Sequence, residues 1–304
     1  MEVMTAKRAV ARREVRRELR GWLFASPYLL YAFIFFLIPL GWSLFLVFQD
    51  WDLIAPAPLF VGLANFKEAL SSPRVWNAFL VTYKFMILLV PLVLAASIGL
   101  ALILHNVPRF KQLFAVGFFL PYLASGVAVS LVVKGLLSYN SALNVLLRAL
   151  FGSSPDWLGN GTLAVLTITM MVVWKLSGYY SLIFLAGLQS IPGELYEAAS
   201  IDGANAWTTF WRVTLPMLYP SFYTVLILVV GLTFALFTEP FTLTSGGPQM
   251  ATQTWQLEIY YQAFNQFRSG YGATVALLNA VATLISILVI RRLVEAWGHR
   301  YGWD

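Results

Sequence analysis

Residues 79–104 read FLVTYKFMILLVPLVLAASIGLALIL, a run whose one charged side chain is Lys84. A helix needs about 20 mostly apolar residues to cross roughly 30 Å of hydrocarbon. The run is longer than that, and it is too long and too apolar for a helix of a water-soluble core. We therefore predict that residues 79–104 cross a membrane as a helix.

The rest of the chain repeats this pattern. The 304 residues are 59% hydrophobic and 11% charged, whereas a soluble domain is about 45 to 50% apolar and about 25% charged. The mean hydropathy of +0.73 agrees with this contrast and excludes a water-soluble globular protein. The predicted fold class is all-α, a polytopic membrane protein with six transmembrane helices. The other five predicted spans are residues 22–48, 113–136, 163–188, 217–237 and 271–293.

The basic residues predict the orientation. If the N-terminus lies inside, the inner segments hold thirteen of the twenty basic residues and the outer loops only four, as the positive-inside rule requires. Both termini are therefore expected in the cytoplasm. Residues 1–21 carry seven basic residues with no cleavage site after them, so we expect a retained cytoplasmic segment lying on anionic headgroups. The six-span domain is predicted over 22–293, and 294–304 form a cytoplasmic tail.

Several chemistries find no support. The chain has no cysteine, and its two histidines, His105 and His299, are far apart, so no metal site is expected. A P-loop needs a lysine directly after glycine, and none of the six lysines follows one. No His, Cys or paired carboxylates converge in the spans, which disfavours a membrane enzyme. Basic residues gather at the ends of apolar runs rather than among aromatics, so nucleic acid is not an expected partner. We expect a transport subunit without a cofactor of its own.

Structured connections are expected between the spans. Three outer connections, 49–78, 137–162 and 238–270, are too long for simple turns and are predicted to form caps. In the inner connection 189–216, Ser190 is a candidate helix cap, and Gly203 is predicted to end that helix with a positive φ. Asn205 is expected to cap a second helix reaching about residue 212. This elbow either rests on the bilayer or docks a soluble partner.

The inner connection carries a specific motif. EAASIDGA at 197–204, followed by Phe210, Val213, Leu215-Pro216 and Pro220, resembles the EAA loop of permease subunits in binding-protein-dependent ABC importers. GLQSIP at 187–192, FVGLANF at 60–66 and LTSGGP at 243–248 are similar to the carbohydrate-uptake branch. Within that branch the last motif, with Ala251-Thr252 and residues 260–264, resembles the maltose-permease-F type of subunit. Thr238-Glu239 departs from the pattern, because many relatives have an Asp there.

The resemblance implies a mechanism and partners. It implies a type I ABC importer permease in a bacterial or archaeal inner membrane that imports an oligosaccharide or disaccharide. A second permease, a dimeric cytoplasmic ATPase holding ATP and Mg, and an external sugar-binding protein would complete the complex. The EAA helix would sit in a groove of the ATPase, and Gly246, Gly247 and Pro248 would touch the binding protein. The implied coupling residues are Glu197, Ala198, Ala199, Asp202, Gly203, Ala204, Phe210, Leu215 and Pro216.

The substrate path is less clearly marked. A lysine in mid-bilayer is costly, so Lys175 either lines a polar cavity or pairs with another helix, while Lys84 and Lys134 lie near span ends and can snorkel. Aromatic faces with hydroxyl groups suit sugars. Span five offers a stripe that either closes the cavity or simply packs. The candidate path residues are Trp174, Lys175, Tyr179, Tyr180, Thr233 and Phe237.

Two other substrates or mechanisms stay open. A glycerol-phosphate-like or other polyol-derived anion would find a counter-charge in Lys175. An ion-coupled secondary transporter is the rival from another class. It is disfavoured because the first four spans contain no Asp or Glu, which a proton or sodium couple usually needs.

Overall fold

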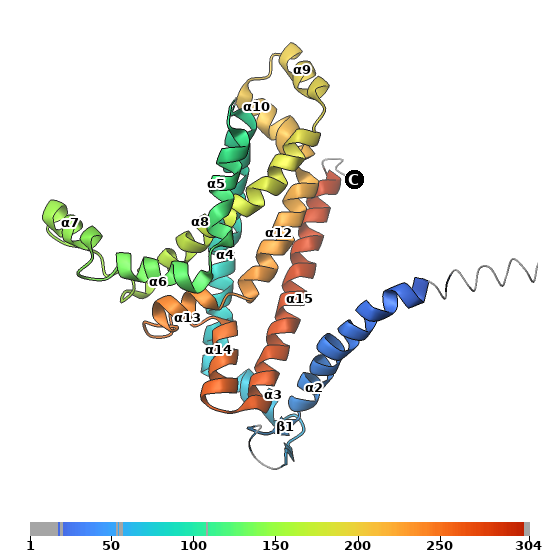
Figure 1. Cartoon of the computed structure of the whole chain (residues 1–304), viewed down its shortest axis with the longest axis vertical. Helices are drawn as coiled ribbons and strands as arrows, with labels where there is room; N and C mark the ends of the chain where they lie inside the picture. The colour runs from blue at the N-terminus through green and yellow to red at the C-terminus, as the bar shows by residue number, and fades with distance from the viewer. Residues whose placement is uncertain (1–17, 19–20, 53, 55–56, 108, 301–304) are drawn as a thin grey trace, which may run out of the picture.

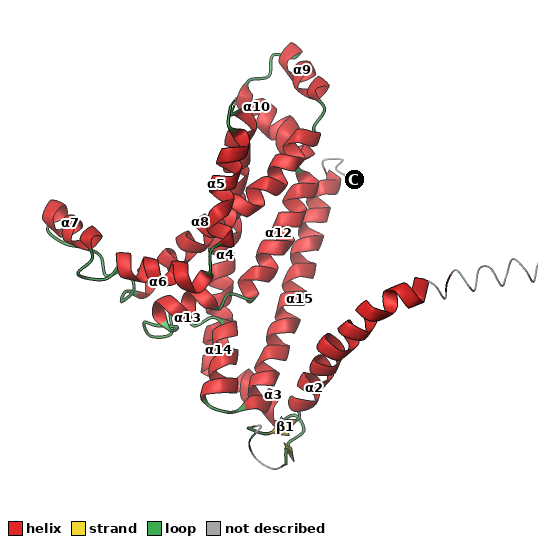
Figure 2. Ribbon diagram, in the orientation of Figure 1, coloured by secondary structure: helices red, strands yellow, loops and turns green. Residues whose placement is uncertain are grey.

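The computed structural model describes residues 18, 21–52, 54, 57–107 and 109–300. Most of the basic segment 1–21, and residues 301–304 of the tail, lie outside the described residues. The described chain is almost entirely helical (Figures 1 and 2). Its two short strands, β1 (Gln49–Asp50) and β2 (Leu59–Phe60), pair antiparallel with Gln49 opposite Phe60. The predicted all-α fold class is confirmed.

Four of the predicted spans are continuous helices. They are Gly21–Leu46, α4 (Pro73–Asn106), α8 (Gly161–Ser190) and α15 (Ser269–Arg300). The first contains a π-helical turn, η1 (Phe33–Leu37), and ends as α2 (Ile38–Leu46). At about 1.5 Å per residue α4 is about 50 Å long, so its ends extend beyond a hydrocarbon layer of roughly 30 Å.

The third predicted span is broken. α5 (Lys111–Leu123) and α6 (Gly126–Leu136) meet at 90°, and α6 runs across the end of α5 instead of continuing it (Figure 1). Pro121 removes a backbone donor from the last turn of α5, and Ala124 and Ser125 have extended ψ angles of 141° and 126°. A single straight helix over 113–136 is therefore wrong.

The fifth predicted span differs at both ends. α12 (Tyr219–Phe234) follows a helical run at 70°, made of α10 (Ala206–Thr209), η2 (Phe210–Thr214) and α11 (Leu215–Met217). At the other end, the N–H groups of Ala235 and Leu236 bond to carbonyls only three residues back, which closes the helix. Phe237 instead occupies the N-cap position of the next helix, α13 (Thr238–Thr244). The predicted span 217–237 is therefore too long, and Glu239 and Pro240 lie in the first turn of α13.

The outer connections are folded, as expected. They contain α3 (Ala64–Ser71), α7 (Ala142–Phe151), α13, α14 (Trp255–Tyr260) and η3 (Tyr261–Asn265). The Glu258 side chain on α14 is fully buried and accepts hydrogen bonds from Arg74, Gln253 and Gln262 at 2.6 to 3.3 Å. A buried carboxylate with this many donors is stabilised, so the cap is a packed unit rather than a flexible linker.

The packed core joins α4, α8 and α12. Its fully buried side chains include Phe85, Leu89 and Phe184, and Phe234 packs on the same cluster. The helix Gly21–Leu46 contacts α15 only near its Leu46 end and diverges from the bundle toward the N-terminus (Figure 1). Only 6% of its most apolar window is buried inside the chain. In a membrane protein such apolar faces meet lipid or another subunit.

Candidate functional site

The inner connection forms an elbow at one end of the molecule. Its first limb, α9 (Gly193–Ile201), ends in a Schellman cap in which the Ala204 N–H bonds to the Ala199 carbonyl and the Gly203 N–H bonds to that of Ser200. Gly203 has φ +74°, the left-handed conformation that the sequence predicted. The EAA residues thus make the turn that separates the two limbs.

Ser190 does not cap this helix. Its hydroxyl donates to the Gly187 carbonyl at the end of α8, and Pro192 occupies the N-cap position of α9 without a side-chain bond. A serine hydroxyl in the last turn of a long helix has carbonyls within reach one turn back, and that local bond is made here. The expected serine cap is therefore wrong.

The second limb anchors the elbow to the bundle. The Asn205 side chain accepts a bond from the Thr208 N–H at 2.8 Å, which confirms the predicted cap. Phe210 and Leu215 pack against the core cluster, and the Tyr196 and Thr214 hydroxyls, 3.3 Å apart, connect α9 to η2. Of the predicted coupling residues, Phe210 and Leu215 therefore hold the elbow in place.

The first limb is open to solvent or to a partner. α9 has no buried residue, and Ile201 at its end is 87% exposed. Glu197, Ala198 and Asp202 are exposed along the same limb. A hollow of about 460 Å³ lies between α9 and the second limb, with Ala198, Ala199, Asp202, Gly203 and Ala204 among its lining residues. In Figure 1 α9 lies at the tip of the molecule, beyond the end of α5.

A second candidate site lies within the spans. Lys175 Nζ on α8 is 3.1 Å from Glu239 Oε1 on α13, and the two side chains are only 16% and 9% exposed. α6 begins against this pair, because a Cβ on Gly126 would lie 2.9 Å from Lys175 Nζ. The structure therefore places Lys175 in an ion pair, the second of the two alternatives that its depth allowed.

Aromatic rings flank the ion pair. Tyr179, on the next turn of α8, stacks on Tyr122 of α5 with ring centroids 4.3 Å apart and planes 10° apart. Phe237 stacks on Phe241, and Tyr260 contacts both rings at 5.2 Å. Sequence reasoning missed Tyr122 and Tyr260, because their positions beside these rings depend on the packing of α5 on α8 and on the fold of the connection that contains α13 and α14.

The predicted path residues separate into two groups. Trp174 is 54% exposed and Tyr179 is partly exposed, whereas Tyr180 and Thr233 are buried inside the chain. The Thr233 hydroxyl bonds to the Val229 carbonyl of its own helix. In this conformation Tyr180 and Thr233 pack between helices and do not face an open path. Phe237 does not share a helix face with Thr233, because α12 ends at Phe234.

The glycine-proline loop is compact and connects α13 to α14. It follows α13, where Ser245 and Gly246 have positive φ and the Gly247–Pro248 peptide bond is cis. Pro248 and Ala251 approach the first residue of α8, Gly161. The loop is therefore a tight outer turn, and its contact with a binding protein stays a prediction.

Comparison with known proteins identifies the family. Residues 18–301 match the model of the family described as binding-protein-dependent transport system inner membrane component. The chain belongs to that family. The permease is 32% identical over 285 residues to the multiple sugar-binding transport system permease protein MsmF of Streptococcus mutans, covering 92% of this chain and 97% of that protein.

Two further comparisons give one more relative and one solved structure. The sn-glycerol-3-phosphate transport system permease protein UgpA of Agrobacterium fabrum is 33% identical over 294 residues, covering 92% of the permease and 96% of that protein. In a crystal structure of a bacterial ABC transporter that imports the acidic polysaccharide alginate, one chain superposes with a TM-score of 0.80 at 22% identity. That match covers 95% of the permease and 98% of that chain, and it establishes a shared fold.

Proposed function

We propose that the permease is one of two different transmembrane subunits of an ATP-driven importer for an uncharged oligosaccharide or disaccharide. An extracytoplasmic binding protein delivers the sugar to the outer face, where the loop Gly246–Pro248 meets it. A dimeric cytoplasmic ATPase, which carries the ATP and Mg, docks on the elbow. Both termini then lie in the cytoplasm.

The exposed first limb of the elbow carries this proposal. An isolated nine-residue helix is marginal in water, and α9 has no fully buried residue, although Tyr196 packs on the bundle core. Its end presents Ile201, and an exposed apolar side chain on a rigid cap is a typical anchor for a partner. Glu197 and Asp202 add negative charge beside that anchor. A basic, apolar-lined groove on the ATPase matches this surface.

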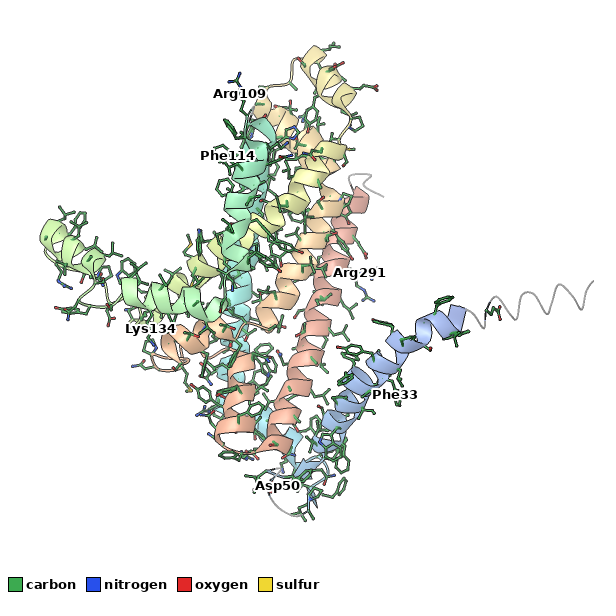
Figure 3. All side chains as sticks on the ribbon, viewed as in Figure 1. Phe33, Asp50, Arg109, Phe114, Lys134 and Arg291 are labelled. Carbon is green, nitrogen blue, oxygen red and sulfur yellow. The ribbon has the colours of Figure 1, made fainter. Side chains whose placement is uncertain are left out.

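The elbow is built to transmit motion. Phe210 and Leu215 fix the second limb to the bundle core, and the limb continues directly into α12. A displacement of α9 by the ATPase is therefore passed to the second limb through the Gly203 turn and the Tyr196–Thr214 contact, and from there to α12. The elbow and Arg109 lie at one end of the molecule and Asp50 at the other (Figure 3), as alternating inner and outer connections require.

The charge of the intramembrane site favours an uncharged substrate. Lys175 would be the counter-charge for a glycerol-phosphate-like anion, but its ammonium group already faces the Glu239 carboxylate at 3.1 Å. Binding an anion would require breaking this pair and leaving a carboxylate nearby. The stacked Tyr122 and Tyr179 rings supply the aromatic surface and the hydroxyl groups that a sugar uses.

Co-purification tests the proposal. The tagged permease is extracted gently from its native membrane, and the co-eluting chains are identified for the wild type, Glu197→Gln and Gly203→Asp. We expect a second six-span protein and an ATPase, with less ATPase in both variants. Gly152→Asp is the matched control, because Gly152 also has a positive φ but ends the outer helix α7. A permease that elutes alone, even after crosslinking, would favour the secondary-transporter alternative.

A further inference from the structure

A large hollow lies where the elbow joins the spans. It has a volume of about 870 Å³ and opens between the second limb, the first turns of α12 and the last part of α15. We call it the inner pocket. Its lining includes Arg212, Met217, Tyr219, Tyr223, Arg291 and Glu295.

The inner pocket lies at the level where the apolar part of the spans ends. In α15 the apolar run 271–290 stops at Arg291 and Arg292, and α12 begins with Tyr219. Arginines and tyrosines at the cytoplasmic end of spans mark the headgroup region of a membrane. Figure 3 shows Arg291 projecting outward from α15, so this wall of the pocket faces the surroundings of the bundle.

The pocket has a positive charge that the described residues do not neutralise. Arg291 Nε donates to Glu295 Oε1 at 2.8 Å, and the guanidinium group also hydrogen-bonds to Tyr223, so only some of its five N–H groups remain for a further acceptor. Arg212, on η2, is exposed, and no described carboxylate lies within ion-pair distance of it. Two guanidinium groups and one carboxylate therefore line the pocket.

The remaining lining is suited to a ligand with an apolar part. Met217, Pro216 and Pro220 provide apolar surface directly beside the guanidinium groups. The Tyr219 and Tyr223 rings, with centroids 6.2 Å apart, add phenol hydroxyls at the same level. A guanidinium pair binds a phosphate oxygen by charge-assisted hydrogen bonds, whereas the apolar wall fits glycerol and acyl carbons. A small inorganic anion would leave that wall uncovered.

We propose that the inner pocket binds the headgroup of an anionic phospholipid of the cytoplasmic leaflet, of the phosphatidylglycerol type. The lipid phosphate lies between Arg212 and Arg291. Since Arg212 belongs to the elbow and Arg291 to α15, the lipid connects the elbow to the sixth span. The transport complex is therefore expected to retain this lipid and to need it for firm attachment of the elbow.

Lipid retention by the purified complex tests the proposal without any transport assay. The complex is stripped of lipid in detergent, titrated with phosphatidylglycerol or phosphatidylcholine, and weighed intact by native mass spectrometry. We expect one phosphatidylglycerol per permease to bind in preference to phosphatidylcholine. Arg212→Gln and Arg291→Gln should each weaken it about five-fold, the usual effect of one basic residue at an anionic surface.

Matched controls separate the pocket from general surface attraction. Arg292→Gln removes the same charge at the neighbouring residue of α15, which does not line the pocket, and should leave retention within two-fold of wild type. Arg212→Lys, which keeps the charge, should lose less than Arg212→Gln. Inorganic phosphate at 10-fold excess over the lipid should not displace it.

Three results would overturn the proposal. Equal losses in Arg292→Gln and Arg291→Gln would mean attraction to the surface as a whole. Displacement by inorganic phosphate would mean a site for a free anion. Unchanged retention in the Arg212→Gln/Arg291→Gln double variant, eluting as the intact complex, would mean that the pocket holds no lipid. Each readout is independent of whether the substrate is a sugar.

Discussion

Removing one partner of the Lys175–Glu239 pair should destabilise the permease far more than removing both. The pair joins α8 to α13 with both side chains largely buried, and α6 begins against it. Glu239→Gln leaves the Lys175 ammonium buried without its counter-charge, and breaking a buried pair in this way costs about 3 to 5 kcal/mol. At about 2 °C per kcal/mol for a chain of this size, the melting temperature should fall by about 6 to 10 °C.

The double variant isolates the interaction. Lys175→Met with Glu239→Gln removes both charges and should stay within about 1 kcal/mol of wild type, because the desolvation of the two ions is relieved together. The assay is thermal unfolding of the detergent-solubilised permease, followed by fluorescence-detected size exclusion. Lys84→Met is the matched control, since Lys84 is an exposed intramembrane lysine. Additive shifts in the single and double variants would refute the pairing argument.

Three further predictions concern the elbow and the outer cap. Gly203→Ala should weaken ATPase co-purification several-fold. A Cβ at this position meets no atom within 4 Å, so the expected loss comes from the left-handed φ, which costs about 1 to 2 kcal/mol for alanine. Gly203→Asn, which tolerates that φ, should lose less, and equal losses in the two variants would contradict the conformational argument. The hydrogen bond from the Arg268 guanidinium lowers the pKa of Glu68 below its usual value, so the pair stabilises the cap when Glu68 is ionised, and the effect is lost as pH falls through the lowered pKa. Because the pair is half exposed, the difference in unfolding free energy between pH 6 and pH 3 should shrink measurably, but by less than about 1 kcal/mol, in Arg268→Gln, and an unchanged difference would contradict this prediction. Glu258→Leu leaves the donors of Arg74 and two glutamines without their acceptor and should lower the melting temperature by several degrees, whereas the exposed Glu68→Leu should change it little.

The apolar runs were sufficient to predict the continuous spans, because length and hydropathy are local properties. They did not predict the break after Leu123, since Ala124 and Ser125 are each compatible with a helix and their extended conformation follows from how α6 packs on α13. Pro121, two residues before the end of α5, is the local signal in the sequence for this break. The end of α12 at Phe234 had no such local marker.

The elbow was more predictable than the intramembrane site. Gly203 and Asn205 act through bonds to residues within a few positions, so their roles follow from local chemistry. The partner of Lys175, Glu239, lies 64 residues away in the sequence. It belongs to the first turn of α13, a helix that was not predicted. Pairing across that distance depends on the break in the third span and the early end of the fifth, which are tertiary features.

The docking of a cytoplasmic ATPase on α9 is the central claim, and photocrosslinking from its tip tests it most directly. A benzophenone amino acid is placed at position 201 in cells, with position 151 on the outer helix α7 as a control of similar exposure. The account predicts that position 201 crosslinks to an ATP-binding protein and position 151 does not. Crosslinks from position 201 to lipid alone, with the ATPase present in the same membranes, would contradict it.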